Sequence, residues 1–235
     1  MQEDKTVIAL IAMKGHSSRV KRKNLRLVAG RPLYHWVVSN LLAAKRISEV
    51  VIETDSDEIE ADVREHFGLR VLRRPDRLLG DDVVMNELLE FHLSELDGEH
   101  FIQSHATNPL VRPETFDAGI AAYFESLSAH DSVFSVSRLQ TRLFWQTGEA
   151  INHDPEHLIP TQNLDPVFEE NSCFYVFSRA SFAASGKRIG RQPLMFPTEH
   201  LESVDIDEMH QLVFAEHLLN EARATAAAGS NATGG

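Results

Sequence analysis

Short apolar segments alternate with segments of helical periodicity through the first 136 residues of this chain. The apolar segments are short and rich in β-branched residues, which is typical of buried strands. We expect strands at residues 7–11, 50–52, 69–73, from 101, and at 132–136. Helices are expected between them, at residues 32–44, 56–66, 84–96 and 113–127. This alternation predicts right-handed βαβ units, and therefore an α/β fold with a mostly parallel sheet flanked by helices.

The loop that follows the first expected strand concentrates positive charge. Seven Lys or Arg side chains lie from Lys14 to Arg31, with no Asp or Glu among them. Because the whole chain carries −12, the remaining residues carry −19. A loop containing glycine and serine at the carboxyl end of a parallel strand also offers backbone N–H groups, so this segment predicts a polyphosphate site. A solvated surface loop or a nucleic-acid patch would have a similar composition, although the −19 elsewhere disfavours nucleic acid.

The stretch from Ile11 to Asn24, IAMKGHSSRVKRKN, resembles the signature loop of the acylneuraminate cytidylyltransferase family. That loop usually reads IPARGGSKRIPRKN and aligns here without a gap. Lys14 stands where the family has arginine, His16 where it has glycine and Ser18 where it has lysine. The matching positions include Ser17, Arg19, Arg22, Lys23 and Asn24. The resemblance implies a Rossmann-like fold of the nucleotide-diphospho-sugar transferase type, and an enzyme that activates sialic acid or a related nonulosonic or ulosonic acid as its CMP-sugar.

Two further segments extend this resemblance on the nucleotide side. Arg74, in an Arg-Arg-Pro segment after the third expected strand, matches an Arg-Pro segment of the family and implies a nucleotide contact. A surface ion pair with Asp76 or Asp81 is the alternative, and such pairs contribute little to stability. Gln103 matches a glutamine that faces the nucleotide in the family's L-Q-P-T-S-P-L element. His105 has no family counterpart; we interpret it as a capping or packing residue, with a catalytic role left open.

The approach to a further buried strand at residues 172–177 departs from the family pattern. Where the family commonly has R-x-N-G, with the arginine near the sugar, this chain reads Glu169-Glu170-Asn171-Ser172. Asn171 is retained, so the resemblance implies a sugar contact there. The acidic Glu170 and the serine in place of glycine indicate that the sugar contact differs from the family's usual one.

A pair of carboxylates near the C-terminus forms the second chemical centre. Asp205 and Asp207 are two residues apart, so in an extended segment both point to one side while Val204 and Ile206 point to the other. Two carboxylates this close repel unless a cation lies between them, and Mg²⁺ with triphosphate oxygens fits. A helix N-cap at Asp207 is the simpler alternative. The resemblance implies the metal pair, because the family has I-D-I-D before its last helix.

The length and composition are those of one ordinary globular domain. With 235 residues and 43% hydrophobic residues, we expect a single nucleotidyltransferase domain at residues 1–226. The strand–helix alternation ends at residues 138–171, where Pro155, Pro160 and Pro166 interrupt short β-type pieces. We expect a protruding hairpin and loop there, and the resemblance implies that this excursion forms a homodimer interface. Residues 227–235 have low complexity and predict a disordered tail.

Several features argue against a secreted or membrane protein. The N-terminal MQEDKT is unlike a signal peptide, and no apolar run approaches the ~18–20 residues that span a bilayer. A single cysteine, Cys173, excludes an internal disulfide and is interpreted as a small core residue. The twelve histidines are scattered, with no convincing group of metal ligands. We expect a cytoplasmic protein.

The sequence therefore predicts a cytidylyltransferase that converts CTP and a sialic-acid-like 2-keto sugar acid into the CMP-sugar and pyrophosphate. The expected catalytic residues are Lys23, Arg19 and Asp207, and Asp205 and Asp207 are expected to hold Mg²⁺. The nucleotide is expected to contact Ala12, Lys14, Ser17, Asn24, Arg74 and Gln103, and the sugar Asn171 and Gln103. A different acid, such as a KDO-type ulosonate or a phosphonate, and a non-catalytic nucleotide-binding homologue remain as alternatives.

Overall fold

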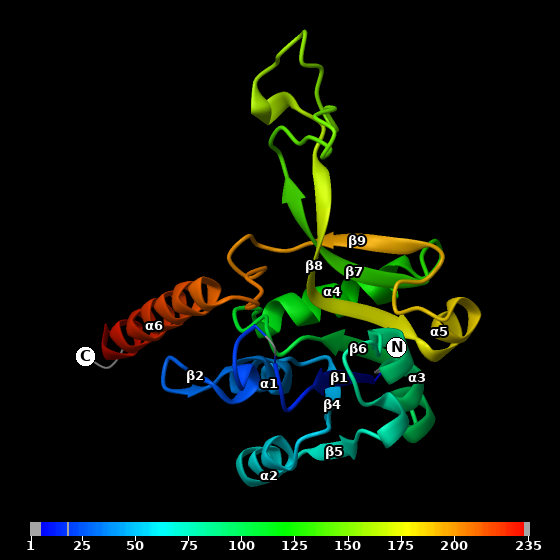
Figure 1. The fold of residues 1–235 in the computed structure, drawn as a ribbon, viewed down its shortest axis with the longest axis vertical. Coiled ribbons are helices and arrows are strands. Elements are labelled where there is room, and N and C mark those ends of the chain that lie inside the picture. Colours follow the sequence, from blue (N-terminus) through cyan, green and yellow to red (C-terminus); the bar gives the residue numbers. More distant parts are fainter. Residues whose placement is uncertain (1–5, 18, 233–235) are drawn as a thin grey trace.

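The computed structural model describes residues 6–17 and 19–232, with side chains to residue 224. In this part of the chain seven strands form one sheet in the order β5-β4-β1-β6-β8-β7-β9 (Figure 1). The strands are β1 Val7–Met13, β4 Ile47–Thr54, β5 Arg70–Arg73, β6 His100–Ser104, β7 Ser132–Leu139, β8 Val167–Ser178 and β9 Pro193–Pro197. Neighbours are parallel except at β8, which is antiparallel to β6 and β7. The predicted mostly parallel sheet is confirmed.

Helices cover both faces of the sheet (Figure 1). Those described are α1 Leu33–Ala43, α2 Asp57–His66, α3 Met85–Glu95, α4 Pro113–Ser126, α5 Arg179–Ser185 and α6 Met209–Ala232. Short 3-10 turns lie at η1 Lys23–Leu25, η2 Asp76–Leu78 and η3 Thr161–Asn163, and β2 Leu27–Val28 pairs with β3 Arg31–Pro32. Ser56 caps α2 as its side chain accepts a hydrogen bond from the Ile59 amide.

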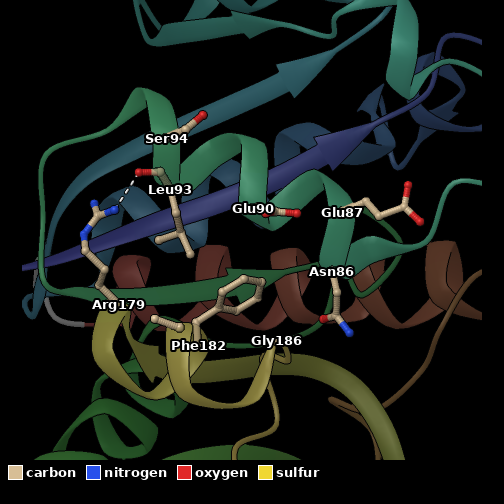
Figure 2. Close-up of a pocket in the computed structure, with 9 residues that line it drawn as sticks. Asn86, Glu87, Glu90, Leu93, Ser94, Arg179, Phe182 and Gly186 are labelled. Carbon is tan, nitrogen blue, oxygen red and sulfur yellow. Dashed lines mark hydrogen bonds between the residues drawn. The ribbon is translucent and has the colours of Figure 1, made fainter.

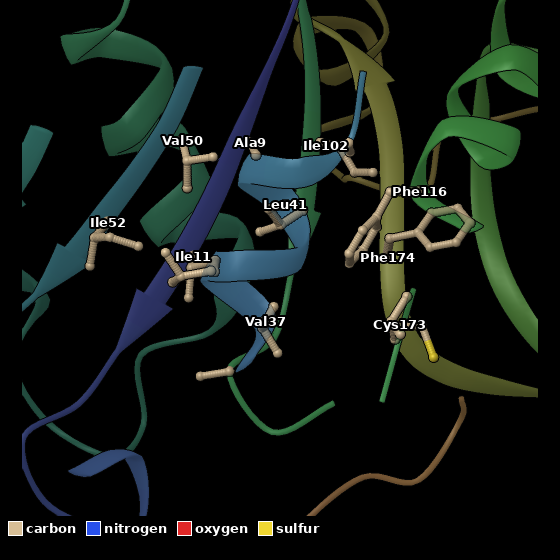
Figure 3. Packing of buried hydrophobic residues seen from close by; sticks show 14 of the residues in the cluster. Ala9, Ile11, Val37, Leu41, Val50, Ile52, Ile102, Phe116, Cys173 and Phe174 are labelled. Carbon is tan, nitrogen blue, oxygen red and sulfur yellow. The ribbon is translucent and has the colours of Figure 1, made fainter. Parts of the chain in front are cut away.

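The alternation along β1 divides the interior into two cores. Ala9 and Ile11 face a core formed with α1, α2 and α4, whereas Ile8 and Leu10 face a core formed with α3 and α5. Figure 3 shows the first core, in which Val37 and other α1 side chains lie against the sheet. Because side chains alternate along a strand, a central strand buried on both faces is apolar throughout. A third cluster packs α6 against α1 and the segment before it.

The elements expected before residue 137 lie within a few residues of their predicted bounds, except that β4 and β7 are longer. Beyond that point the prediction is incomplete. Helix α5 and strand β9 were not expected, and β8 begins at Val167 instead of residue 172. The ends of β7 and β8 pair in an antiparallel ladder and carry residues 140–166 away from the body of the protein (Figure 1).

The C-terminal segment differs from the expectation. Helix α6 continues to Ala232, through residues 227–232, which were predicted to be disordered. Alanine is the residue most favourable to helix formation, and the run Ala226-Ala227-Ala228 outweighs the low complexity that suggested disorder. The last three residues of the expected tail, 233–235, lie outside the described residues, as does Ser18 in the cationic loop. Among the helices described, none has both the length and the hydropathy needed to cross a membrane.

Candidate active site

The loop after β1 is held closely against the β4–α2 connection. The Gly15 amide donates a hydrogen bond to Asp55 Oδ1 at 2.6 Å. A Cβ at Gly15 would lie 2.7 Å from Ser56 Cβ, a contact too short for any other residue. The Asn24 side-chain amide donates to the Lys14 carbonyl oxygen at 3.0 Å. Gly15 and Asn24 therefore fix the path of the loop at the carboxyl end of β1.

The loop's cations meet the C-terminal carboxylates. Lys23 Nζ lies 3.0 Å from Asp207 Oδ1 and also donates to the Ile206 carbonyl oxygen at 2.9 Å. Arg19 Nη2 donates to the same Asp207 oxygen at 2.8 Å. Lys23 is largely enclosed, with 13% of its side chain exposed. The fold thus brings together two motifs that the sequence separates by more than 180 residues.

Asp205 lies beside this pair with an unsatisfied oxygen. Its Oδ1 is buried and has no hydrogen-bond partner among the described residues. Burial raises the pKa of Asp205, and the charge of Asp207 raises it further against the opposing charges of Lys23 and Arg19. Ile206, between the two acids, is fully buried, as the alternation predicts. A buried carboxylate oxygen without a donor is a fitting ligand for a cation.

The helix N-cap alternative for Asp207 does not hold. Helix α6 begins at Met209, and the backbone N–H groups of Asp207 and Glu208 both donate to Gln211 Oε1, at 2.8 and 2.7 Å. Gln211 therefore accepts from the two backbone amides that precede the helix. The Asp207 carboxylate is left to face Lys23 and Arg19.

The other nucleotide-side residues lie around the same loop. Lys14 Nζ donates to the Gly80 carbonyl oxygen at 2.8 Å and to Asp81 Oδ1 at 3.0 Å, which ties the loop to the segment before α3. Ala12 lies near the end of β1, and Ser17 is half-buried within the loop. Their nucleotide contacts remain predictions.

Arg74 is a buried structural cation in this structure. Its side chain is 1% exposed, and its Nε and Nη2 donate to the two oxygens of Glu53 at 2.6 and 2.8 Å. The alternative of a surface ion pair with Asp76 or Asp81 is wrong, because the β4–β5 pairing places Arg74 beside β4. Arg74 Nη1 is buried without a hydrogen bond. A nucleotide contact by Arg74 remains a prediction.

Gln103 lies at the end of β6 and meets an arginine that the sequence analysis did not identify. Its Nε2 donates to the Ser104 carbonyl oxygen at 2.7 Å, and its Oε1 accepts from Arg188 Nη1 at 2.5 Å. Arg188 lies between α5 and β9, and its guanidinium stacks on the Tyr175 ring at 3.6 Å. No local motif marks Arg188, since both neighbouring elements were themselves missed.

His105 is a neutral acceptor in this environment. Burial and the nearby charges of Arg188 and Lys23 lower the pKa of His105 to about 3. His105 Nε2 lies 3.2 Å from Arg188 Nη1, a donor without an acceptor lone pair, so the histidine accepts this hydrogen bond. The contact favours the packing interpretation and links Arg188 to the Lys23 side of the site.

Asn171 holds an irregular turn within β8. Its Nδ2 donates to Thr198 Oγ1 at 2.8 Å and to Ser137 Oγ at 3.2 Å, while its Oδ1 accepts from the Cys173 amide at 3.3 Å. The β7–β8 register shifts here. The following Ser172 has φ of 60°, the left-handed region that favours glycine. The amide of Asn171 is thus engaged within the protein, and its sugar contact remains a prediction.

A cluster of two histidines and an aspartate lies apart from these residues. His35 and His66 converge on Asp62 between α1 and α2, a group of possible metal ligands that the sequence analysis missed because His35 lies on a different helix from the other two. His35 Nε2 is 2.6 Å from Asp62, which also accepts from Tyr34, so hydrogen bonds already account for this cluster.

A cavity of about 470 Å³ lies between α3 and α5 (Figure 2). Leu93 and Phe182 give it an apolar side, and Glu87 and Glu90 lie along α3. Arg179 closes one end, where it donates to the Leu93 carbonyl oxygen at 2.6 Å. The cavity contains none of the predicted site residues.

The comparisons with known proteins agree with this geometry. A family model described as Cytidylyltransferase matches residues 8–228. The N-acylneuraminate cytidylyltransferase of Oncorhynchus mykiss is 29% identical over 188 residues, covering 76% of this chain and 43% of the trout protein. The CMP-N,N'-diacetyllegionaminic acid synthase of Legionella pneumophila is 27% identical over 229 residues, covering 91% of this chain and 96% of that protein. The chain spans about half the length or less of the fish cytidylyltransferases it matches.

Solved structures support the fold. A CMP:2-keto-3-deoxy-manno-octonic acid synthetase complexed with CTP superposes with a TM-score of 0.67 at 15% identity, over 93% of this chain and 99% of that one. A 4-diphosphocytidyl-2C-methyl-D-erythritol synthase from Anaerococcus prevotii gives 0.64 at 14% identity, over 93% of this chain and 100% of that one. With the family model matching most of its length, this chain belongs to the cytidylyltransferase family.

Proposed function

We propose that this protein transfers the CMP group of CTP to a 2-keto sugar acid of the sialic, legionaminic or KDO-like type, with release of pyrophosphate. The observation that supports this most is the meeting of Lys23 and Arg19 with Asp207, beside the unsatisfied oxygen of Asp205. The family and the named activities of the relatives point to the same chemistry. A phosphonate acceptor, outside this class of sugar acids, is the nearest alternative.

The chain's own residues supply charge and position for an in-line attack of the acceptor hydroxyl on the α-phosphorus. Lys23, Arg19 and Lys14 would neutralise the phosphates, and such charge stabilisation commonly contributes more than any other effect to the rate enhancement of an enzyme. In this structure the Asp207 carboxylate forms ion pairs with both Lys23 and Arg19. Triphosphate oxygens would compete for both cations and release the Asp207 carboxylate.

Asp205 and Asp207 would then hold Mg²⁺. Magnesium is usually bound by one or two carboxylates together with substrate phosphates and waters, and the buried, unpartnered Asp205 Oδ1 fits that ligand set. When bound, the ion would polarise the α-phosphate and acidify the attacking hydroxyl. Retention of both acids favours an enzyme over a non-catalytic nucleotide binder.

We propose that the protein acts as a homodimer through the excursion at residues 140–166. Phe144, Trp145 and Leu158 are each more than half exposed on this segment, and exposed apolar groups concentrated on a projection are typical of an interface. Trp145→Ser should lower the mass measured by light scattering from dimer to monomer. Leu27→Ser, at an exposed apolar residue in β2, should leave the mass unchanged. A monomeric wild type would contradict this part of the proposal.

We place the activity in the cytoplasm, where a reduced thiol such as the buried Cys173 is the ordinary state. The test of function is pyrophosphate release with each NTP, Mg²⁺ and a panel of 2-keto sugar acids. Release with CTP and one acid, together with the CMP-sugar mass, is the expected result. If CTP binds but no acid of the panel leads to pyrophosphate release, the acceptor is an acid outside the panel or the protein is non-catalytic. Absence of CTP binding would contradict the proposal.

A further inference from the structure

Arg188 is an enclosed cation at the acceptor side of the site. Only 16% of its side chain is exposed. Its guanidinium lies on the Tyr175 ring at 3.6 Å, and its Nη1 donates to Gln103 Oε1 at 2.5 Å. Stacking and this hydrogen bond fix the plane of the guanidinium. The group is therefore positioned before any ligand arrives.

In the described part of the chain, the one ion pair of Arg188 is long and partly exposed. The carboxylate oxygen, Glu170 Oε1, lies 3.6 Å from Nη2, beyond hydrogen-bond distance, and the Glu170 side chain is 45% exposed. That same oxygen accepts a hydrogen bond from the Tyr175 hydroxyl. Arg74 offers the contrast, since both of its bonds to Glu53 are shorter than 3.0 Å. An enclosed charge without a close partner is costly, and an anionic ligand would relieve that cost.

The donors that remain on Arg188 suit a carboxylate. Among the described residues, the hydrogen bonds of its side chain involve only Nη1, to Gln103 and His105. Its Nε and Nη2 are left over, and neither is among the buried atoms without partners. Adjacent guanidinium N–H groups form a fork that binds both oxygens of a carboxylate.

The position of Arg188 links it to the transfer chemistry. Gln103, its partner, is expected to contact both the nucleotide and the sugar. His105 contacts Arg188 and lies within the electrostatic influence of Lys23 and Asp207. The segment at 169–172, where the family has its arginine, contains none here. Arg188 therefore supplies, from the α5–β9 connection, a cation that this segment lacks.

We propose that Arg188 binds the carboxylate of the acceptor acid. In this structure the Glu170 carboxylate lies beside Arg188 and takes part of the place that the acceptor carboxylate would have. This inference rests on the proposed function, because it names the residue that reads the acid group of the acceptor. Arg188 acts as a binding and specificity residue; the phosphate chemistry remains with Lys23, Arg19 and the two aspartates.

The test compares each active 2-keto sugar acid with its methyl ester, which keeps the sugar but lacks the charge. Pyrophosphate release is measured for wild type, Arg188→Gln and Arg188→Lys, with Arg191→Gln as control. Arg191 is an exposed arginine of the same connection, whose guanidinium donates to the Ala184 carbonyl oxygen. The melting temperature and the KM for CTP report whether each variant remains folded and able to bind the nucleotide.

We expect wild type and Arg191→Gln to prefer the acid to its methyl ester. In Arg188→Gln this preference should fall by about 10- to 100-fold, because the KM for the acid rises. Arg188→Lys should recover only part, because it keeps the charge but not the fork. A folded Arg188→Gln that retains the full preference overturns the role of Arg188 alone. A wild type that neither binds nor converts any acid, measured by calorimetry and pyrophosphate release, overturns the proposed function and this inference with it.

Discussion

The cations on the two sides of the site are neutralised to different degrees. On the nucleotide side, Lys23 and Arg19 lie within 3.0 Å of Asp207, and Arg74 is fully paired with Glu53. On the acceptor side, Arg188 is enclosed, yet its nearest carboxylate is 3.6 Å away and half exposed. The nucleotide side keeps most of the family's motif residues, with departures at Lys14, His16 and Ser18, whereas the acceptor side lacks the family's arginine at residues 169–172. We infer from this difference that the transfer chemistry is retained and that the acceptor pocket is changed.

The largest expected effect is at the point where the two motifs meet. Asp207→Ala should abolish detectable pyrophosphate release, since it removes both a proposed metal ligand and the partner of Lys23 and Arg19. Glu208→Ala, at the exposed neighbouring acid, is the matched control and should retain turnover. Wild-type rates in Asp207→Ala would remove Asp207 from the mechanism.

The next largest effect is on stability. It compares Arg74, which is paired closely with Glu53, with Arg188, whose ion pair with Glu170 is longer. Arg74→Met should lower the free energy of unfolding by about 3–5 kcal/mol, because it removes both hydrogen bonds to the buried Glu53 carboxylate and leaves only His92, 3.6 Å away, beside it. Arg73→Met removes only exposed ion pairs with Asp57 and Glu60 and should cost at most about 1 kcal/mol. Arg188→Met, which leaves no buried carboxylate unpaired, should cost less than Arg74→Met. Urea denaturation measures all three, and equal losses at Arg74 and Arg188 would contradict the comparison.

The same pair predicts a pH dependence. Burial raises the pKa of Glu53, but nearby His92, whose Nε2 lies 3.6 Å from Glu53 Oε2, and the hydrogen bonds and charge of Arg74 outweigh it and hold this pKa below its ordinary value of 4.5. The folded-state pKa is depressed, so the stabilisation is complete above pH 4.5 and is lost as the pH falls through the lower folded-state value. Wild type should therefore be more stable than Glu53→Gln near neutral pH, with the gap narrowing in acid. If the difference in stability between wild type and Glu53→Gln stays constant until the protein unfolds in acid, the Glu53–Arg74 pair is not the source of the pH dependence.

Removal of a phosphate-binding cation should have the next largest effect on rate. Lys23→Ala should lower kcat by about 10²–10³-fold, the loss typical when one preorganised donor to the reacting group is deleted. Lys21→Ala, an exposed lysine of the same loop, serves as the control and should change kcat little. If both variants lost the same factor, general loop charge and not the position of Lys23 would carry the effect.

The smallest effect is expected at the turn in β8. Ser172 has φ of 60°, a conformation that costs an L-residue roughly 1–2 kcal/mol and glycine almost nothing. Ser172→Gly also removes a hydroxyl that lies 3.3 Å from the Tyr175 oxygen and can donate a hydrogen bond to it, because the Tyr175 hydroxyl itself donates to Glu170; this loss offsets part of the gain. We expect a net stabilisation of no more than about 1 kcal/mol in urea denaturation. A clear destabilisation would mean that the Tyr175 contact outweighs the backbone strain.

How much of this could be predicted from sequence differs between the same two regions. Strands β1, β4, β5, β6 and β7 and the first four helices follow local periodicity. The Lys23 and Asp207 motifs could be recognised because their spacing and neighbours are local too. The Glu53–Arg74 pair depends on adjacent strands whose register the sequence does not state. Arg188 reaches Gln103 from 85 positions away, out of a connection between two elements that had no clear signal. Contacts of this kind are set by the tertiary fold and leave no local pattern.

The central proposal is that one side of the site binds CTP and the other binds the acceptor acid. The most direct test is a two-substrate kinetic analysis of wild type, Lys23→Ala and Arg188→Gln, with CTP and the preferred acid varied in turn. We predict that Lys23→Ala changes kcat and the KM for CTP, with the KM for the acid close to wild type. Arg188→Gln should raise the KM for the acid and leave the KM for CTP unchanged. If both variants shift the KM of the same substrate, the two sides of the site do not bind different substrates, and the proposed assignment is wrong.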